Sequence, residues 1–197
     1  MNGISHFFAY ISRLRWIKRW SLMRNAISED VALHSWEVAT IAHALGIIHN
    51  QLNETTIDAN RLATAGLYHD ATEVITGDMP TPVKYHSDAI RNAYKGVERK
   101  AEQELLALLP DSLQSDFRAV LIEDELPDVY QQLLKAADRI SAWLKCQAEL
   151  RAGNREFEQA AAEIETRLHA MDSPEVNYFM KVFAPGYEMS LDNLLNG

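Results

Sequence analysis

Hydrophobic residues in this 197-residue chain recur almost everywhere with the period of an α-helix. The pattern is clearest in residues 30–50, where spacings of three and four form one stripe: Val31, His34, Val38, Ile41, Leu45 and Ile48. No strand-like alternation, internal repeat or low-complexity tract is present in the sequence. The chain is also long enough for one substantial core. We therefore predict an all-α fold, a single-domain helical bundle spanning residues 1–197.

Capping and helix-breaking residues place the expected boundaries. We expect helices over residues 4–18, 30–50, 56–75, 87–109, 112–122, 128–151, 155–171 and 174–183. Asp58 or Thr56 can cap the third of them. Residues 19–29 and 123–128 should be loops. The two prolines in residues 77–82 should exclude helix there, because they remove two amide donors.

Charge is unevenly distributed along the chain. The net charge of −9 argues against broad binding to nucleic-acid polymers, yet residues 1–28 carry five basic residues and no acid. This segment could attract a phosphate locally. For most of the five we expect only a solvated helix face: Arg13, Arg15, Lys18, Arg19 and Arg24.

The sequence points to neither a membrane nor an oxidising compartment. No apolar run approaches the roughly 18 residues that a membrane span needs, and the apolar N-terminus lacks the basic start of a signal peptide. The single cysteine, Cys146, cannot form an internal disulfide. We therefore expect a cytoplasmic protein.

The most informative chemical feature is an imidazole beside a carboxylate, His69-Asp70, with Glu73 four residues after the histidine. On a helix Glu73 would lie on nearly the same face as His69. A lone His-Asp pair is usually just a polar pair at a helix end. Two possible metal ligands with an acid behind them are nevertheless typical of a hydrolytic site.

Two further residues strengthen that interpretation. His34 lies within the apolar stripe of its helix, where a histidine is more often hydrogen-bonded in the core than a ligand. Asp138 lies among buried-side residues, and a partly buried carboxylate is costly unless it is paired or binds a cation. A metal inside the bundle would satisfy both residues. A set of two imidazoles and two carboxylates suits Mn, Co, Fe, Ni or Zn better than Mg²⁺.

The order His34, His69-Asp70, Asp138 resembles that of the HD superfamily of metal-dependent phosphohydrolases. Other segments narrow the resemblance to the YfbR-type 5′-deoxynucleotidases of bacteria: His6-Phe7-Phe8, Arg19-Trp20, Leu22-Met23-Arg24-Asn25, Tyr68-His69-Asp70, Gly77 to Tyr85, Lys135-Ala136-Ala137-Asp138 and Leu144-Lys145-Cys146. The string Asp-x-Pro-Thr-Pro-Val-Lys-Tyr, residues 78–85, is the most specific of them. The match covers essentially the whole chain.

The resemblance implies a role for each matching residue. The four metal ligands would be His34, His69, Asp70 and Asp138. Three residues would be catalytic: Arg19, which orients the phosphate, Glu73, which handles the attacking water, and Asp70. Contacts to the substrate would come from Arg19, Trp20, Asp70, Asp78, Met79, Pro80 and Thr81. The implied cofactor is Co²⁺, Mn²⁺ or a similar divalent ion, the substrate a deoxynucleoside 5′-monophosphate, and the assembly a homodimer.

One position departs from the family pattern. Members commonly carry an acid immediately before the first metal histidine, whereas this chain has Leu33. Loss of that acid could weaken metal binding. Leu33 is the one residue that favours an alternative, a non-catalytic nucleotide- or metal-binding module.

Other HD phosphohydrolases with different nucleotide specificity are further alternatives. In a cyclic-dinucleotide phosphodiesterase we would expect a Gly-Tyr-Pro signature, but Gly186-Tyr187 is followed here by Glu188. Triphosphohydrolases for dGTP are usually much longer chains.

Overall fold

The computed structural model describes residues 4–196, and every regular element in that range is helical apart from one isolated bridge between Lys18 and Asp30. The predicted all-α fold is confirmed. The α-helices are α1 (Phe7–Ile11), α2 (Val31–Asn53), α3 (Ala59–Tyr68), α4 (Glu73–Thr76), α5 (Thr81–Lys84), α6 (Asp88–Ala107), α7 (Asp111–Leu121), α8 (Asp128–Arg151), α9 (Glu158–His169), α10 (Pro174–Val182) and α11 (Leu191–Asn196). The 3₁₀ helices are η1 (Ser12–Trp16), η2 (Glu123–Glu125), η3 (Arg155–Phe157) and η4 (Ala184–Glu188).

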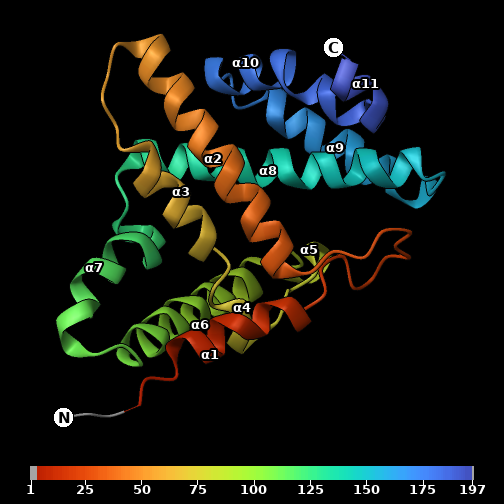
Figure 1. The fold of residues 1–197 in the computed structure, drawn as a ribbon. Coiled ribbons are helices and arrows are strands. Elements are labelled where there is room, and N and C mark those ends of the chain that lie inside the picture. The colour runs from red at the N-terminus through yellow and green to blue at the C-terminus, as the bar shows by residue number, and fades with distance from the viewer. Residues whose placement is uncertain (1–3, 197) are drawn as a thin grey trace.

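Helix α2 is the central element of the bundle. Its N-cap is Asp30, whose side chain accepts a hydrogen bond from the backbone N–H of Leu33. All six residues of the predicted stripe are buried. In Figure 1, α2 crosses α8, with α10 and α11 on one side of the pair and α1, α4 and α6 on the other. The main hydrophobic core lies where α2, α3, α8 and α10 meet.

Helix α2 is also long and apolar enough, by length and composition alone, to cross a membrane, with a mean hydropathy of 1.3 in its 18-residue window. The expectation that no stretch approaches that length is wrong by this measure. However, 56% of the window is buried inside the molecule, and the helix packs against α3, α8 and α10. Those contacts are what a core helix makes.

The helix predicted over residues 56–75 is interrupted at the site. Asp58 caps α3 as expected, accepting from the N–H groups of Asn60 and Arg61, but α3 ends at Tyr68. A turn over residues 69–72 follows, and α4 starts at Glu73. His69 and Asp70 therefore lie in a turn rather than on a continuous helix.

Gly66 allows α3 to approach α2 closely. A Cβ atom at this position would lie 2.8 Å from the Cα atom of Ala39, a distance that real side chains do not tolerate. The close packing of the two helices brings the end of α3 beside α2. A glycine here therefore places the His69 turn next to the helix that carries His34.

The segment after α4 is partly helical, contrary to the prediction. Gly77 ends α4 with a φ of +71°, a conformation that favours glycine. Thr81–Lys84 then forms one helical turn. Pro82 is tolerated in it because a backbone N–H in the first turn has no partner within the helix. Lys84 joins this turn to α6 through an ion pair with Glu98 at 2.9 Å.

The remaining predictions are largely confirmed. Helices α6, α7 and α8 match the expected ranges within about two residues, and residues 19–29 contain no helix. The helix expected over residues 4–18 is shorter, because α1 passes into η1 and the chain becomes extended at Ile17. The N–H of Val31 then donates to the Ile17 carbonyl at 3.0 Å, closing the base of the loop. Residues 123–128, expected to be a loop, contain the short helix η2, and η4 and α11 are further elements that periodicity did not predict.

Candidate metal and phosphate site

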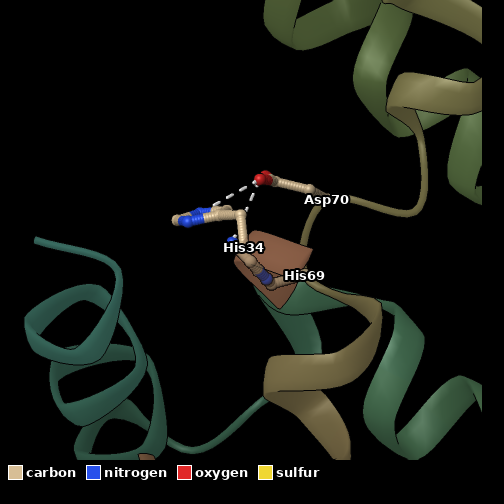
Figure 2. A group of neighbouring side chains, drawn as sticks. All are labelled: His34, His69 and Asp70. Carbon is tan, nitrogen blue, oxygen red and sulfur yellow. Dashed lines mark ion pairs between the residues drawn. The ribbon is translucent and has the colours of Figure 1, made fainter. Parts of the chain in front are cut away.

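Three predicted ligands converge where α2 meets the turn after α3. The Oδ2 atom of Asp70 lies 3.1 Å from Nε2 of His69 and 3.5 Å from Nε2 of His34. The two imidazole rings are 5.2 Å apart between centroids. One potential ligand atom from each residue lies within 4.8 Å of the other two (Figure 2). The break in the helix makes this possible, because neighbouring residues on a regular helix point about 100° apart.

The fourth predicted ligand, Asp138, lies beside His34 but outside the group of three. It belongs to α8, and its Oδ1 atom lies 3.2 Å from Nε2 of His34. Its side chain is 43% exposed, whereas that of His34 is fully buried. Asp138 therefore lies on the open side of the cluster.

The hydrogen bonds of the two histidines fix which nitrogen faces the cluster. Nδ1 of His69 donates to the carbonyl oxygen of Gly66 at 2.8 Å, since a carbonyl can only accept. Nδ1 of His34 lies 3.0 Å from Oγ of Ser141, and that hydroxyl donates to Glu37 at 2.7 Å. Each histidine thus uses Nδ1 as its donor and directs Nε2, the nitrogen that would bind a metal, toward the carboxylates.

The donor set fits a divalent cation. Both Nε2 atoms are buried and have no hydrogen-bond partner among the residues described. Burial acts to lower the pKa of His69, but the charges of Asp70 and Asp138 outweigh it and raise the pKa to about 9. Two unpartnered imidazole nitrogens beside two carboxylates are a mixed nitrogen–oxygen site of the kind that binds Zn, Mn, Co, Fe or Ni.

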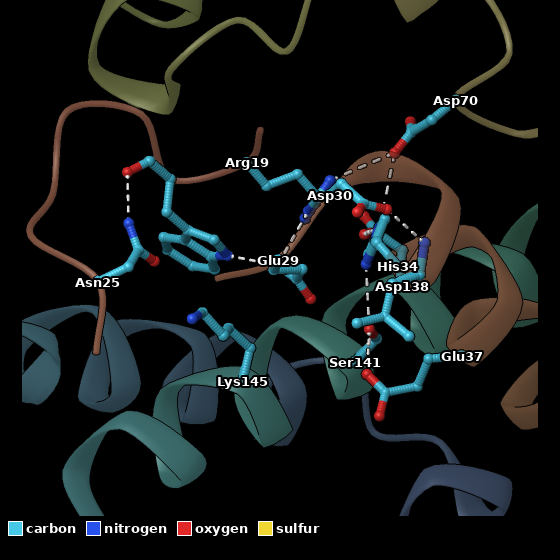
Figure 3. A network of polar contacts seen from close by, with 12 residues as sticks. Arg19, Asn25, Glu29, Asp30, His34, Glu37, Asp70, Asp138, Ser141 and Lys145 are labelled. Atoms are coloured by element: carbon cyan, nitrogen blue, oxygen red, sulfur yellow. Dashed lines mark hydrogen bonds and ion pairs between the residues drawn. The ribbon is translucent and has the colours of Figure 1, made fainter. Parts of the chain in front are cut away.

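Arg19 lies beside the cluster, at the start of the loop that precedes α2 (Figure 3). One Nη atom lies 3.3 Å from Oδ2 of Asp70, and Nε lies 3.3 Å from Oε2 of Glu29. Burial opposes the charge on Arg19, but nearby carboxylates, led by Asp70 and Asp138, hold its pKa above the ordinary value. A guanidinium fixed at this place can bind a phosphate oxygen.

Trp20 follows in a strained conformation. Its φ is +58°, in the left-handed region that residues other than glycine rarely adopt. The indole N–H donates to Oε2 of Glu29 at 2.8 Å, and the ring lies 5.3 Å from that of Phe157. The side chain of Asn25 donates to the Trp20 carbonyl at 3.2 Å. Trp20 is therefore an anchor of the loop, next in the chain to Arg19.

Glu73 and Asp78 are acids in an unfavourable environment. Burial, together with the charges of Asp70 and Asp78, raises the pKa of Glu73 to about 9. Its Oε2 atom is buried and has no hydrogen-bond partner in the described part of the chain. Burial also raises the pKa of Asp78, while Arg19 and a hydrogen bond to the Trp20 backbone oppose that rise. Both acids therefore belong to the electrostatic surroundings of Arg19 and Asp70.

The remaining predicted substrate residues lie together on the loop between α4 and α5. Met79 and Pro80 are partly buried, and Thr81 is exposed at the first position of α5. The carbonyl of Pro80 accepts from the N–H groups of Val83 and Lys84. The loop is thus fixed at its helical end, adjacent to Asp78.

Sequence reasoning missed three residues that support the site: Glu29, Glu37 and Ser141. Glu37 lies three residues after His34 and Ser141 three after Asp138, so helical spacing alone places each beside a predicted ligand. Glu29 carries no such signal. Its side chain is 8% exposed and contacts Arg19 only because the loop folds back.

The departure at Leu33 lies outside these networks. Its side chain is 52% exposed, and its backbone N–H takes part only in the cap of α2. The neighbouring His34 keeps its bond to Ser141. The Leu33 side chain therefore takes no part in the described hydrogen bonds of the cluster.

Comparisons with known proteins agree with this geometry. The family described as 5′-deoxynucleotidase YfbR-like matches residues 6–187. The 5′-deoxynucleotidase of Yersinia pseudotuberculosis serotype I (strain IP32953) is 50% identical over 191 residues, covering 97% of each chain. The 5′-deoxynucleotidase of Yersinia pestis (strain Pestoides F) matches with the same identity and coverage.

Solved structures share the helical architecture. An HD-domain phosphohydrolase from Listeria innocua superposes with a TM-score of 0.79 at 25% identity, covering 92% of this chain and 88% of that one. The HD phosphohydrolase of cyanophage S-2L, bound to dA and one catalytic Zn²⁺ ion, gives a TM-score of 0.66 at 20% identity, with 92% and 96% covered. The second likeness is one of fold alone.

Proposed function

The chain belongs to the YfbR-like family of 5′-deoxynucleotidases, and on this premise we propose that it hydrolyses deoxynucleoside 5′-monophosphates to deoxynucleoside and phosphate. The observation that carries the proposal is the pair of buried, unpartnered Nε2 atoms of His34 and His69 beside the carboxylate of Asp70. Family membership supplies the reaction class, and the geometry supports the choice of residues.

His34, His69, Asp70 and Asp138 would hold the divalent ion, which we expect to be Co²⁺, Mn²⁺ or a similar transition metal. Such an ion would polarise a phosphoryl oxygen and make a water molecule more acidic. Ser141 and the Gly66 carbonyl keep the Nδ1 protons in place, so that both Nε2 lone pairs stay directed inward. Four protein ligands would still leave room for phosphate around an octahedral ion.

The charged groups around the cluster suit an in-line displacement at phosphorus. Arg19 would hold the phosphate through its free Nη donors. Water attacks phosphorus from the side opposite the 5′ oxygen, and its proton passes to the ionised form of Glu73, which the positive charges of Arg19 and of a bound divalent ion would favour over the neutral acid. The P–O5′ bond breaks, and the leaving 5′ oxygen takes up the proton that Glu73 received from the water. Glu73 suits the role, because its buried Oε2 atom is otherwise unpartnered.

Trp20, Asp78 and residues 79–81 would bind the sugar. Asp78 would accept a hydrogen bond from a deoxyribose hydroxyl, and the Trp20 ring would close the pocket on the side where a 2′-hydroxyl would project. Pro80 would contribute shape and rigidity. Asp70, which touches Arg19, would contact both the ion and the phosphate.

The non-catalytic alternative is less well supported. It rested on Leu33, whose side chain is exposed and separate from the described polar networks. A binding module would also have no use for a buried acid such as Glu73.

We also expect a cytoplasmic homodimer. An apolar groove of about 450 Å³ between α2 and the C-terminal helices is bordered by exposed Phe183, Tyr187 and Leu194. Such a face is suited to a second copy of the chain. Light scattering on the purified protein tests this assembly.

The test of function compares 5′-dAMP, 5′-AMP and 3′-dAMP in a phosphate-release assay with added Co²⁺ or Mn²⁺. One buried unsatisfied hydroxyl costs about 1–3 kcal/mol, so 5′-dAMP should be cleaved roughly 5- to 150-fold more efficiently than 5′-AMP. The 3′-monophosphate should react little, since its phosphate would miss Arg19. Asp78→Ala should narrow the gap between the sugars, whereas the exposed control Asp88→Ala should not. Equal rates on the first two substrates would rule out deoxyribose specificity.

A further inference from the structure

We propose that Glu29 is a positioning residue that orients Arg19 and Trp20 together, so that the phosphate contact and the sugar pocket are set by one buried carboxylate. The inference rests on the proposed function for the roles of Arg19 and Trp20. It assigns a task to an acid that neither the sequence motifs nor the metal cluster uses.

A single oxygen of Glu29 joins the two side chains. Its Oε2 atom accepts from Nε of Arg19 at 3.3 Å and from the indole N–H of Trp20 at 2.8 Å (Figure 3). Glu29 is only 7% exposed. The backbone N–H of Arg19 also donates to the Glu29 carbonyl at 3.2 Å. Arg19 is therefore held to Glu29 through both its backbone and its side chain.

These contacts decide which donors of Arg19 remain for a substrate. Glu29 occupies Nε, and Asp70 occupies one hydrogen of Nη1. Nη2 has no acceptor recorded among the described residues. A guanidinium fixed on two sides presents the third to a phosphate with little further loss of rotational freedom.

Trp20 needs a partner because its backbone is strained. With a φ of +58°, the residue persists only when its surroundings fix it. The bond to Glu29 holds the polar end of the indole, and Phe157 packs against its ring. Glu29 thereby links the residue proposed to wall the sugar pocket to the one proposed to hold the phosphate.

The loop itself has other anchors. The carboxylate of Glu149 accepts from the N–H groups of Ala26 and Ile27, and Asn154 donates to the carbonyl of Arg24. None of these bonds uses the side chain of Glu29. Truncating Glu29 should therefore free two side chains while the loop backbone stays in place.

A negative charge beside a phosphate site would ordinarily repel the substrate. Here the charge is buried and paired with Arg19, so the interaction that matters is geometric. The neutral variant Glu29→Gln separates the two roles, because its amide oxygen has two lone pairs and can accept from both donors. A positioning role predicts that the amide rescues function.

The experiment compares Glu29→Ala, Glu29→Gln and Trp20→Phe on 5′-dAMP and on p-nitrophenyl phosphate, which has no sugar. Loss of a hydrogen bond to a charged group should cost Glu29→Ala about 10- to 100-fold in kcat/KM on both substrates, mainly through KM. Glu29→Gln should stay within about threefold of the unmutated protein. Trp20→Phe should lose more on 5′-dAMP than on the aryl phosphate. Metal content should not change in any of them.

A double mutant and a control complete the design. In an Arg19→Ala background, Glu29→Ala should add less than about threefold on the aryl phosphate, because the residue through which it acts is gone. Glu156→Ala is the matched control, since Glu156 also contacts this loop, at the Arg24 N–H, but touches neither Arg19 nor Trp20. It should behave as the unmutated protein.

Two results would overturn the proposal: losses in Glu29→Gln as large as in Glu29→Ala, or full additivity with Arg19→Ala. If Glu29→Ala does not fold, a loss of about tenfold or more in Glu29→Gln, or a Trp20→Phe protein that loses as much on the aryl phosphate as on 5′-dAMP, would overturn it instead. An unmutated protein that cleaves the aryl phosphate but not 5′-dAMP would defeat the proposed substrate. The role of Glu29 would remain measurable on the aryl phosphate.

Discussion

Two buried polar clusters in this protein use similar residues in opposite ways. In the first, here called the anchor cluster, Lys145, Glu149 and Asn154 satisfy one another. Glu149 has a fully buried side chain and accepts from Lys145, from Asn154 at 2.7 Å, and from two loop N–H groups at 2.8 and 2.9 Å. Lys145 also donates to the carbonyl of Ile27. The charged groups of the anchor cluster are thus paired inside the protein.

The second, here called the ligand cluster, is His34, His69, Asp70 and Asp138. It leaves two buried imidazole nitrogens without a hydrogen-bond partner, and its carboxylates lie close together. Buried polar atoms are nearly always hydrogen-bonded in a folded protein, so the two unpaired Nε2 atoms are candidates for binding a ligand. Whether the buried polar atoms are paired therefore distinguishes the anchor cluster, which supports the fold, from the ligand cluster, which is arranged to bind a metal ion.

The largest expected effect comes from removing a ligand. His69→Ala or Asp138→Ala should lose bound metal and lower phosphate release from 5′-dAMP about 10³-fold or more, because the ion supplies several kcal/mol of transition-state stabilisation. Neither variant should unfold the metal-free protein. Full activity in Asp138→Ala protein without metal would show that this residue is not a ligand. Metal analysis and circular dichroism on the same samples provide the comparison.

Replacing Glu73 should affect turnover without affecting the ion. Glu73→Ala removes proton handling, which typically contributes about 10²–10⁴-fold to a rate. Metal content should stay at the unmutated level. If it fell in step with the rate, Glu73 would be a ligand rather than the acid that handles the water. Glu158→Ala, on the exposed surface of α9, is a suitable control.

The anchor cluster should respond in stability. Glu149→Ala leaves Lys145 buried without its partner, which should cost about 3–5 kcal/mol in the free energy of unfolding, measured by urea denaturation. The exposed ion pair of Lys100 with Glu104 offers a control, since Glu104→Ala should change stability by no more than about 1 kcal/mol. If Glu149→Ala lost metal but kept its stability, the anchor cluster would serve metal binding rather than the fold, contrary to the comparison above.

The same cluster predicts a pH dependence. Burial acts to raise the pKa of Glu149, but hydrogen bonds from Lys145, Asn154 and the loop lower it to about 2. A carboxyl with a lowered folded-state pKa stabilises the fold above its unfolded pKa, near 4.5. That contribution is lost as the pH falls from about 4.5 to about 2. Urea midpoints of the unmutated protein should fall over this range more steeply than those of Glu149→Ala.

The smallest effect should come from removing the Ser141 hydroxyl, which is hydrogen-bonded to Nδ1 of His34. Ser141→Ala removes the acceptor for the Nδ1 proton, and loss of such a partner typically weakens metal binding about 10- to 100-fold. A metal titration gives the affinity. An unchanged affinity would mean that packing alone orients the imidazole.

The helical framework could be predicted from the sequence because apolar spacing and capping residues within each long helix indicate where it lies. The stripe in α2 and the boundaries of α8 follow from apolar spacing and from the flanking loop residues. Asp58 marks the start of α3 by its capping chemistry. Such features depend only on residues close in the sequence.

The break after Tyr68 could not be predicted in the same way. Apolar spacing continues through residues 56–75, and only the approach of α2 at Gly66 and the turn at His69 divide the segment. Pro82 predicts a break in helix, but proline is acceptable in a first turn, and Thr81–Lys84 is helical. These outcomes depend on tertiary contacts that periodicity does not record.

Within the candidate site, the sequence identified the residues with distinctive chemistry and missed those with ordinary chemistry. His34, His69, Asp70 and Asp138 stood out by type and by resemblance, and the fold brings them together. Glu29 did not, because a glutamate in a loop is unremarkable until the loop folds back on Arg19.

The most direct test of the central claim is a titration of chelator-treated protein with Co²⁺, following phosphate release from 5′-dAMP. The account predicts no release before metal is added and a rise that reaches its plateau at one ion per chain. Full activity in the chelated protein, or a rate that does not respond to added ion, would contradict the assignment of the ligand cluster.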